Sequence, residues 1–181
     1  MNVYKFHISK LDVAKRQLET AITLYFHNAD PVSVHTLTGA AYDVLHDLCK
    51  VRNIKPFVKN TDLVREEKKK EYVDMINAAQ NFFKHADKDP EGIYEFRPQT
   101  TDFFIWDACQ MYQKITTEIP KLLFIYSVWF YSQHPDLINY ELAKQVLLEA
   151  KQYSELQSRA HFFQEMSAAY DRTSQFGAYK N

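Results

Sequence analysis

The run LLFIYSVWFY, residues 122–131, is the longest apolar stretch of the chain. A helix needs about 20 apolar residues to cross a bilayer, so this run is too short to be a membrane anchor. Pro120 precedes it and His134-Pro135 follow it, which predicts a helix that starts at Pro120 and ends before His134. Because this helix would be apolar on nearly every side, we expect it to lie at the centre of a helical bundle.

The segments before this run also have helical spacing, and two of them begin with clear capping signals. Ser9 with Asp12 is a variant of the capping box, which predicts a first helix from about residue 9 to residue 27. Asp30 followed by Pro31 is an N-cap with proline at the first helical position. It predicts a second helix that ends near Val51.

Four further segments follow from the same reasoning. A third helix is expected from Thr61 or Asp62 to about His85, and then an irregular segment, 86–100, with a short strand-like piece, IYEF. A fourth helix is expected over 102–115, capped by Thr100 or Thr101. Residues 136–172 are helical in period, and a second capping-box signature at 154–157 predicts a break near residue 153.

These elements predict an all-α fold, a single-domain bundle of six or seven helices over residues 1–172, with a flexible tail at 173–181. The chain has 181 residues, of which 46% are hydrophobic, so it is long enough to bury a sizeable core. It contains only three glycines, which disfavours sheet proteins because tight β-turns depend on glycine.

Composition also limits the location and the partners. The net charge is -1, so no overall excess of positive charge draws the chain to nucleic acid or to an anionic membrane. The two cysteines, Cys49 and Cys109, lie far apart, which fits a reducing cytosol. The N-terminus lacks the apolar run of a signal peptide. We therefore expect a cytoplasmic protein that is not bound to a membrane.

Several common enzyme motifs are absent from the sequence. The glycines lie too far apart for a P-loop or a dinucleotide-binding fingerprint. The sequence contains no G-x-S-x-G, no H-E-x-x-H and no C-x-x-C. These absences exclude the motif-bearing classes and leave enzymes without short motifs, binding modules and interaction proteins.

Asn81 and His85 form the first candidate site. They are four residues apart, at the end of the third helix, so they share one helix face. A histidine near neutral pH can give or take a proton, which suits general acid–base chemistry. The alternative is structural: Lys84 and His85 are cations at a helix C-terminus, where the helix dipole favours them.

The stretch Gln80-Asn81-Phe82-Phe83-Lys84-His85 resembles the R-x(4-6)-H motif of the HEPN superfamily, whose members are helical bundles. The polar residue and the histidine match, whereas Gln80 stands where the motif has arginine. Active members resemble metal-independent ribonucleases that need no cofactor, in which histidine moves a proton and arginine stabilises the phosphorane.

The resemblance implies a site at His85 and Asn81, with Lys84 as the cationic helper, Gln80 and Asp87 as substrate-binding residues, and the 86–100 loop beside the groove. Because glutamine carries no charge, loss of catalysis is expected, with RNA or nucleotide binding retained. The resemblance also implies a homodimer, and a partner protein in a defence or toxin–antitoxin type of system.

Two other classes of function remain open. The second predicted helix carries His35, Asp43 and His46, and Asp43 and His46 have the spacing of ligands in metal-binding bundles, although no E-x-x-H occurs. A structural or regulatory interaction module without catalysis is the other class. The aromatic residues between 103 and 131 fit either a core or a base-stacking surface, and any surplus on the central helix fits a dimer interface.

Overall fold

The computed structural model describes residues 5–62, 64–87, 89–137 and 158–175. Six α-helices lie in these residues: α1 (Lys10–Phe26), α2 (Pro31–Val51), α3 (Lys69–Lys84), α4 (Thr100–Thr116), α5 (Lys121–Gln133) and α7 (Arg159–Gln175). Short 3₁₀ turns occupy Glu66–Lys68 and Pro135–Leu137. The described part of the chain contains no strand, so the predicted all-α bundle is confirmed.

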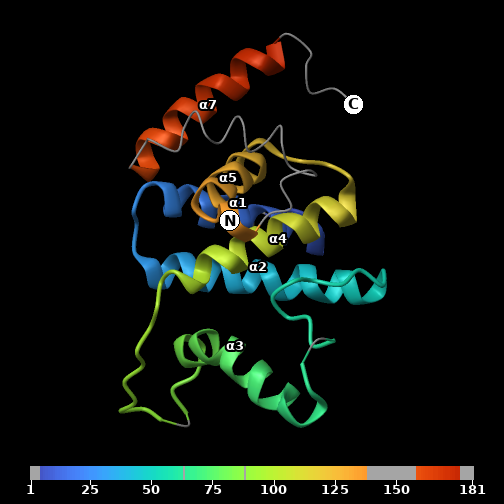
Figure 1. The fold of residues 1–181 in the computed structure, drawn as a ribbon, viewed down its shortest axis with the longest axis vertical. Helices are drawn as coiled ribbons and strands as arrows, with labels where there is room; N and C mark the ends of the chain where they lie inside the picture. The colour runs from blue at the N-terminus through green and yellow to red at the C-terminus, as the bar shows by residue number, and fades with distance from the viewer. Residues whose placement is uncertain (1–4, 63, 88, 138–157, 176–181) are drawn as a thin grey trace.

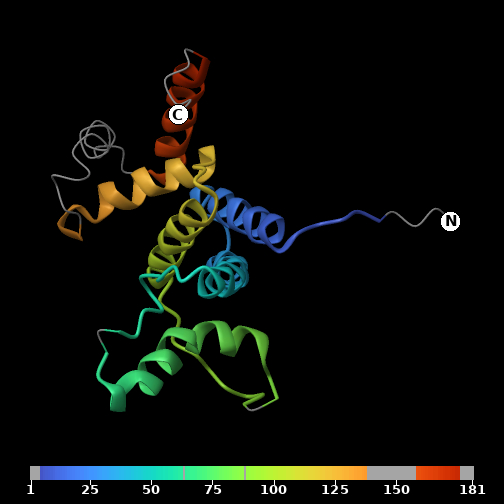
Figure 2. The same cartoon turned by 90° about the vertical axis from the view of Figure 1, so that its right-hand side faces the viewer.

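The helices stack in layers along the long axis of the molecule. Figure 1 shows α7 at the top, α1, α2, α4 and α5 in the middle and α3 at the bottom. Within the middle layers α1 packs on α2, and α2 packs on α4. Figure 2 shows that α3 lies on the α2 and α4 side of the bundle, away from α5 and α7, and that residues 5–9 extend outward from the start of α1.

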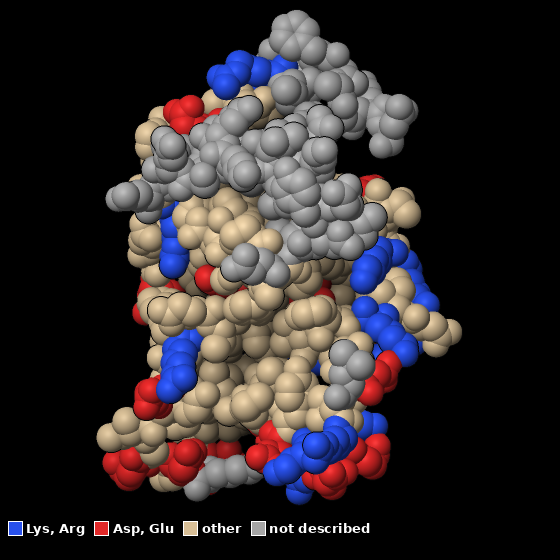
Figure 3. All heavy atoms as spheres, viewed as in Figure 1, with Lys and Arg blue, Asp and Glu red and all other residues tan. Residues whose placement is uncertain are grey.

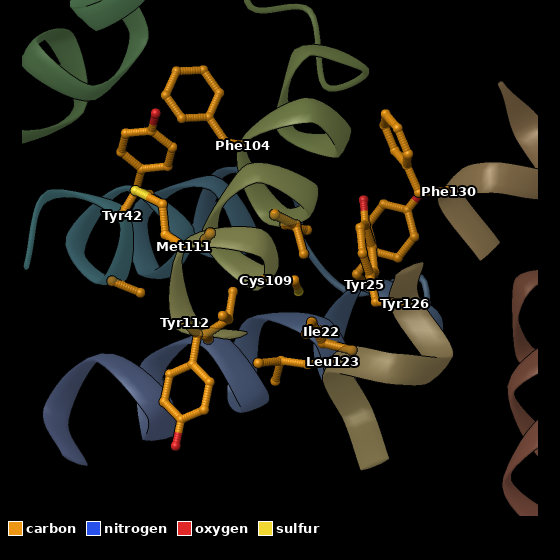
Figure 4. Packing of buried hydrophobic residues seen from close by; sticks show 14 of the residues in the cluster. Ile22, Tyr25, Tyr42, Phe104, Cys109, Met111, Tyr112, Leu123, Tyr126 and Phe130 are labelled. Carbon is orange, nitrogen blue, oxygen red and sulfur yellow. The ribbon is translucent and has the colours of Figure 1, made fainter. Parts of the chain in front are cut away.

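The core is one cluster of buried side chains that spans Ala14 to Met166 in sequence. Six side chains of α5 are buried in it: Leu123, Ile125, Tyr126, Val128, Trp129 and Phe130. The Tyr126 ring meets Tyr25 of α1 edge-on, with 5.3 Å between centroids (Figure 4). Helix α5 is therefore a core helix, as its apolar sequence predicts, and most of its aromatic residues are buried. It is not the centre of the bundle, because the most extensive packing is that of α2 against α1 and α4.

The first two helices begin as the capping signals predict. The Ser9 hydroxyl accepts a hydrogen bond from the Asp12 backbone N–H at 3.1 Å, and the Asp12 carboxylate accepts one from the Ser9 N–H at 3.2 Å. The Asp30 carboxylate accepts from the Ser33 N–H at 2.8 Å. Each bond satisfies an N–H that the helix itself cannot bond.

The third helix starts later than predicted, at Lys69. Asp62 is not its cap, because its carboxylate pairs with Lys55 and its N–H donates to the Asn60 side chain. The preceding linker is fixed by tertiary contacts instead: the N–H groups of Phe57 and Val58 donate to the buried carboxylate of Asp107 on α4.

The IYEF segment, residues 93–96, is not a strand. Its aromatic side chains lie against other rings, with Tyr94 stacked on Phe82 at 5.4 Å and Phe96 beside Phe83 at 5.1 Å. The predicted cap of α4 is also wrong. Gln99 occupies the N-cap without a side-chain hydrogen bond, while the Thr100 hydroxyl donates back to the Arg97 carbonyl.

The helical prediction for residues 136–172 can be compared with the structure only outside residues 138–157. The expected break near residue 153 lies outside the described residues. Helix α7 continues to Gln175, three residues past the expected domain end. None of the helices in the described ranges is long and apolar enough to cross a bilayer.

Candidate functional site

A polar groove of about 680 Å³ lies between α2 and α3, with the linker residues Lys59 and Thr61 at one side. It brings together the two groups of candidate residues from the sequence. Helix α2 contributes Asp43 and His46, and helix α3 contributes Gln80, Asn81, Lys84 and His85. Residues about 40 positions apart in the chain therefore line one site.

Asp43 is the centre of the groove's polar contacts. Its carboxylate accepts a hydrogen bond from the Gln80 side-chain amide at 2.6 Å and pairs with the Lys59 ammonium at 2.9 Å. The Lys84 ammonium lies 3.8 Å from it. Lys59 from the linker and Gln80 and Lys84 from the candidate motif thus lie around one carboxylate of α2.

Gln80 lines the groove, but its side chain is held in place by its neighbours. Its side chain is buried, at 5% exposure, and it packs directly on Gly39 of α2. A Cβ atom at Gly39 would lie 2.9 Å from the Gln80 Cδ atom, which is closer than real contacts. Gly39 therefore serves close packing of α3 on α2, which is one of the reasons for a glycine inside a helix.

The groove carries a small excess of positive charge. Lys50, Lys59 and Lys84 line it together with Asp43 and Asp47. Lys50 pairs with Asp47 at 3.0 Å, and both side chains are largely exposed. Lys59 is mostly buried, and its ammonium also lies 5.1 Å from the centre of the Tyr42 ring. Three lysines against two aspartates leave one net positive charge.

Asn81 and His85 lie on an exposed ridge, as expected for residues that border the core. Both line the polar groove and also an adjoining hollow of about 500 Å³. His85 is the C-cap of α3, and its backbone N–H donates to the Asn81 carbonyl at 3.1 Å. The side chains of this pair are thus available from two sides.

Asp87, the expected substrate-binding residue, is exposed and lines neither of these two hollows. Asp89 takes that place, beside Phe82 and Tyr94 in the adjoining hollow. Its position depends on the turn Asp89-Pro90-Glu91-Gly92, which the Gly92 N–H closes onto the Asp89 carbonyl at 2.8 Å. Asp-Pro-x-Gly is a typical type I turn sequence, so this signal was present in the sequence.

His35 does not belong to the groove. It is buried, its Nδ1 atom lies 2.9 Å from the Thr101 hydroxyl, and three phenylalanine rings surround it. Burial, and secondarily Lys84, lowers its pKa to about 4, so it is neutral at pH 7. His35 is therefore a core histidine with a satisfied hydrogen bond.

The proposed metal ligands are not brought together. His35 and His46 are 11 residues apart on α2, or about 16 Å along the axis. No cluster of three or more His, Cys, Asp or Glu side chains in the described ranges is arranged to hold a metal ion. His46 lines the groove beside Asp43, and burial, with the nearby Lys50 and Lys59, lowers its pKa.

The groove combines cations, amides and imidazoles, which are the groups that bind phosphate. The lining residues that sequence reasoning missed include Lys50, Lys59 and Asn77. Lys59 follows no pattern, since it lies in an irregular linker and reaches the groove only through the tertiary fold. Asn77 precedes Asn81 by one helical turn, so the helical period alone could have found it.

Comparison with models of known protein families finds no match. No curated protein and no solved structure matches the chain significantly.

Proposed function

We propose that this chain is an HEPN-like helical protein that binds single-stranded RNA or a nucleotide in the polar groove without cleaving it. The observation that carries the proposal is the convergence of Lys50, Lys59, Lys84 and His85 on one groove between α2 and α3. Lysine ammonium groups bind phosphate through charge, and the flanking Asn77 and Asn81 amides can donate hydrogen bonds to phosphate oxygens.

The adjoining hollow supports RNA as the ligand. It shares Asn81 and His85 with the groove and adds the ring of Tyr94, which is stacked on Phe82. Aromatic rings of this kind stack on unpaired bases. A chain laid across the Asn81–His85 ridge would place a phosphate near Lys84 and a base beside Tyr94.

The state of Gln80 supports binding without cleavage. In the HEPN motif the equivalent arginine stabilises the negative charge of the phosphorane. Gln80 carries no charge, is buried, and has its amide bonded to Asp43. Lys84 is the cation of the motif segment, yet its ammonium already lies 3.8 Å from the Asp43 carboxylate. The groove can hold a phosphate but offers little extra stabilisation to a transition state.

The test is fluorescence anisotropy of a labelled short single-stranded RNA with the full chain, at several salt concentrations. Lys84→Ala is expected to weaken binding about three- to tenfold and to make its salt dependence shallower. Lys70→Ala is the matched control, because Lys70 lies on the same helix, is exposed and is outside the groove. Equal affinities for the two variants would refute the groove as the binding site.

Cleavage is tested on the same RNA in EDTA, with wild type beside His85→Ala. No cleavage by either protein is expected. Cleavage that requires His85 would show instead a metal-independent ribonuclease that works without the motif arginine. If the wild type neither binds nor cleaves, the regulatory interaction module becomes the better account.

A further inference from the structure

A second pocket, of about 590 Å³, lies between the 57–64 linker, α3 and the start of α4. The linker and α3 separate it from the polar groove. On the linker, Val58 and Asn60 line this pocket, whereas Lys59 lines the groove; on α3, Tyr72 and Ile76 face the pocket. Figure 3 shows the surface between α4 and α3 as a tan area, with charged side chains gathered around its edge.

The walls of the pocket are held by buried hydrogen bonds. The Val58 N–H donates to the Asp107 carboxylate at 2.7 Å, and the Tyr72 hydroxyl donates to the Val58 carbonyl at 2.7 Å. The Phe57 ring packs edge-on against Trp106, with 5.2 Å between centroids. The linker wall is therefore tied to both α4 and α3, and the pocket is formed before any ligand arrives.

The lining is apolar and uncharged. Seven of its residues are aromatic or aliphatic, and none is charged: Phe57, Val58, Val64, Tyr72, Ile76, Phe103 and Phe104. The remaining three are Asn60, Gln99 and Thr100. An uncharged lining disfavours a charged ligand, because such a ligand would lose its hydration without gaining a partner. Gln99 and Thr100, adjacent at the start of α4, can bond a polar group at one edge.

We propose that this pocket binds a neutral, mostly aromatic small molecule with a hydrogen-bonding group at one edge. The volume lies within the range of small-molecule sites, which are mostly apolar with a few polar groups. Walls tied by hydrogen bonds favour a small ligand over a protein helix, which usually requires a long, open groove. This proposal does not depend on RNA binding in the polar groove.

The test is a fluorescence titration of the full chain with N-phenyl-1-naphthylamine, a neutral aromatic probe, excited directly. Ile76→Trp is designed to fill the pocket from α3. Met75→Trp is the control, because Met75 is the preceding residue, is 63% exposed and lies outside the pocket. Wild type and Met75→Trp are expected to bind one probe per chain, and Ile76→Trp to bind it more than about tenfold more weakly.

Equal probe binding by Ile76→Trp and Met75→Trp, or a titration that does not saturate, would overturn the proposal. If Ile76→Trp does not fold, Val64→Trp fills the same pocket from the linker. Light scattering at each concentration detects a second copy of the chain, and probe binding that disappears as the chain dimerises would assign the pocket to that copy. RNA anisotropy of Ile76→Trp should stay unchanged, which separates this test from that of the groove.

Discussion

Replacement of Gly39 by alanine tests how α3 is seated on α2. In an ordinary helix interior, Gly→Ala raises stability by about 1 kcal/mol, because alanine loses less backbone entropy on folding. At Gly39 the new Cβ atom would lie 2.9 Å from the Gln80 Cδ atom and 3.0 Å from its Nε2 atom. Gln80 would have to move, and it is held by its hydrogen bond to Asp43.

The balance is expected to be unfavourable. A hydrogen bond to a charged group contributes about 1.5–3 kcal/mol, and a shifted Gln80 would lose most of this contribution. Against the helical gain of about 1 kcal/mol, we expect Gly39→Ala to lower the free energy of unfolding by about 1 kcal/mol. In a Gln80→Ala background the obstacle is absent, so the same substitution should raise it by about 1 kcal/mol.

Urea denaturation followed by circular dichroism measures the four proteins of this double-mutant cycle. The expected coupling free energy between positions 39 and 80 is about 2 kcal/mol. This is well above the deviation from additivity, about 0.5 kcal/mol, that is usual for two independent sites. If Gly39→Ala stabilises both backgrounds equally, Gln80 does not fill the space above Gly39. The inference that packing on Gly39 holds the Gln80 side chain in place would then be incorrect.

Three further predictions use the same denaturation assay. Burial holds the pKa of His35 at about 4, so stability should fall as pH drops from about 6.5 to 4, and His35→Gln should flatten this dependence. Burial raises the pKa of Asp102 to about 6. The contribution of this carboxyl to the free energy of unfolding is therefore present below about pH 4 and is lost as pH rises through 6. Asp102→Asn should remove this decrease in stability. If His35→Gln leaves the pH dependence of stability unchanged, burial does not lower the pKa of His35. If Asp102→Asn leaves it unchanged, burial does not raise the pKa of Asp102. Asp107→Ala should lower the free energy of unfolding by about 3 kcal/mol, and a loss below about 1 kcal/mol would refute its role as the anchor of the linker.

The helices whose signals are local could be predicted from the sequence. Ser9 and Asp30 cap α1 and α2 because a capping residue needs only its own next three residues. The burial of α5 in the core followed from its apolar residues on nearly all sides. Local propensity failed at Asp62, where an ion pair with Lys55 replaced the expected cap.

The groove could be predicted only in part. Asn81, Lys84 and His85 share the end of one helix, so their proximity follows from the helical period. That Asp43 and His46 lie opposite them depends on how α3 crosses α2, which Gly39 and Gln80 decide through close packing. His35 was wrongly grouped with Asp43 and His46 because it lies on the same helix. Its surroundings in the structure are phenylalanine rings.

Asp107 explains why the linker side of the polar groove and of the apolar pocket could not be predicted from the sequence. Its carboxylate accepts hydrogen bonds from the Tyr42 hydroxyl at 2.6 Å and from the N–H groups of Phe57 and Val58. One buried side chain therefore satisfies backbone groups that a helix or a sheet would otherwise satisfy. The Tyr42 hydroxyl in turn accepts from the Lys59 N–H at 3.2 Å. Alternate linker residues consequently face opposite sides, Val58 toward the apolar pocket and Lys59 toward Asp43 of the groove. Because one anchor positions both, Asp107→Ala should weaken probe binding in the pocket and RNA binding in the groove together, whereas Ile76→Trp should affect the pocket alone.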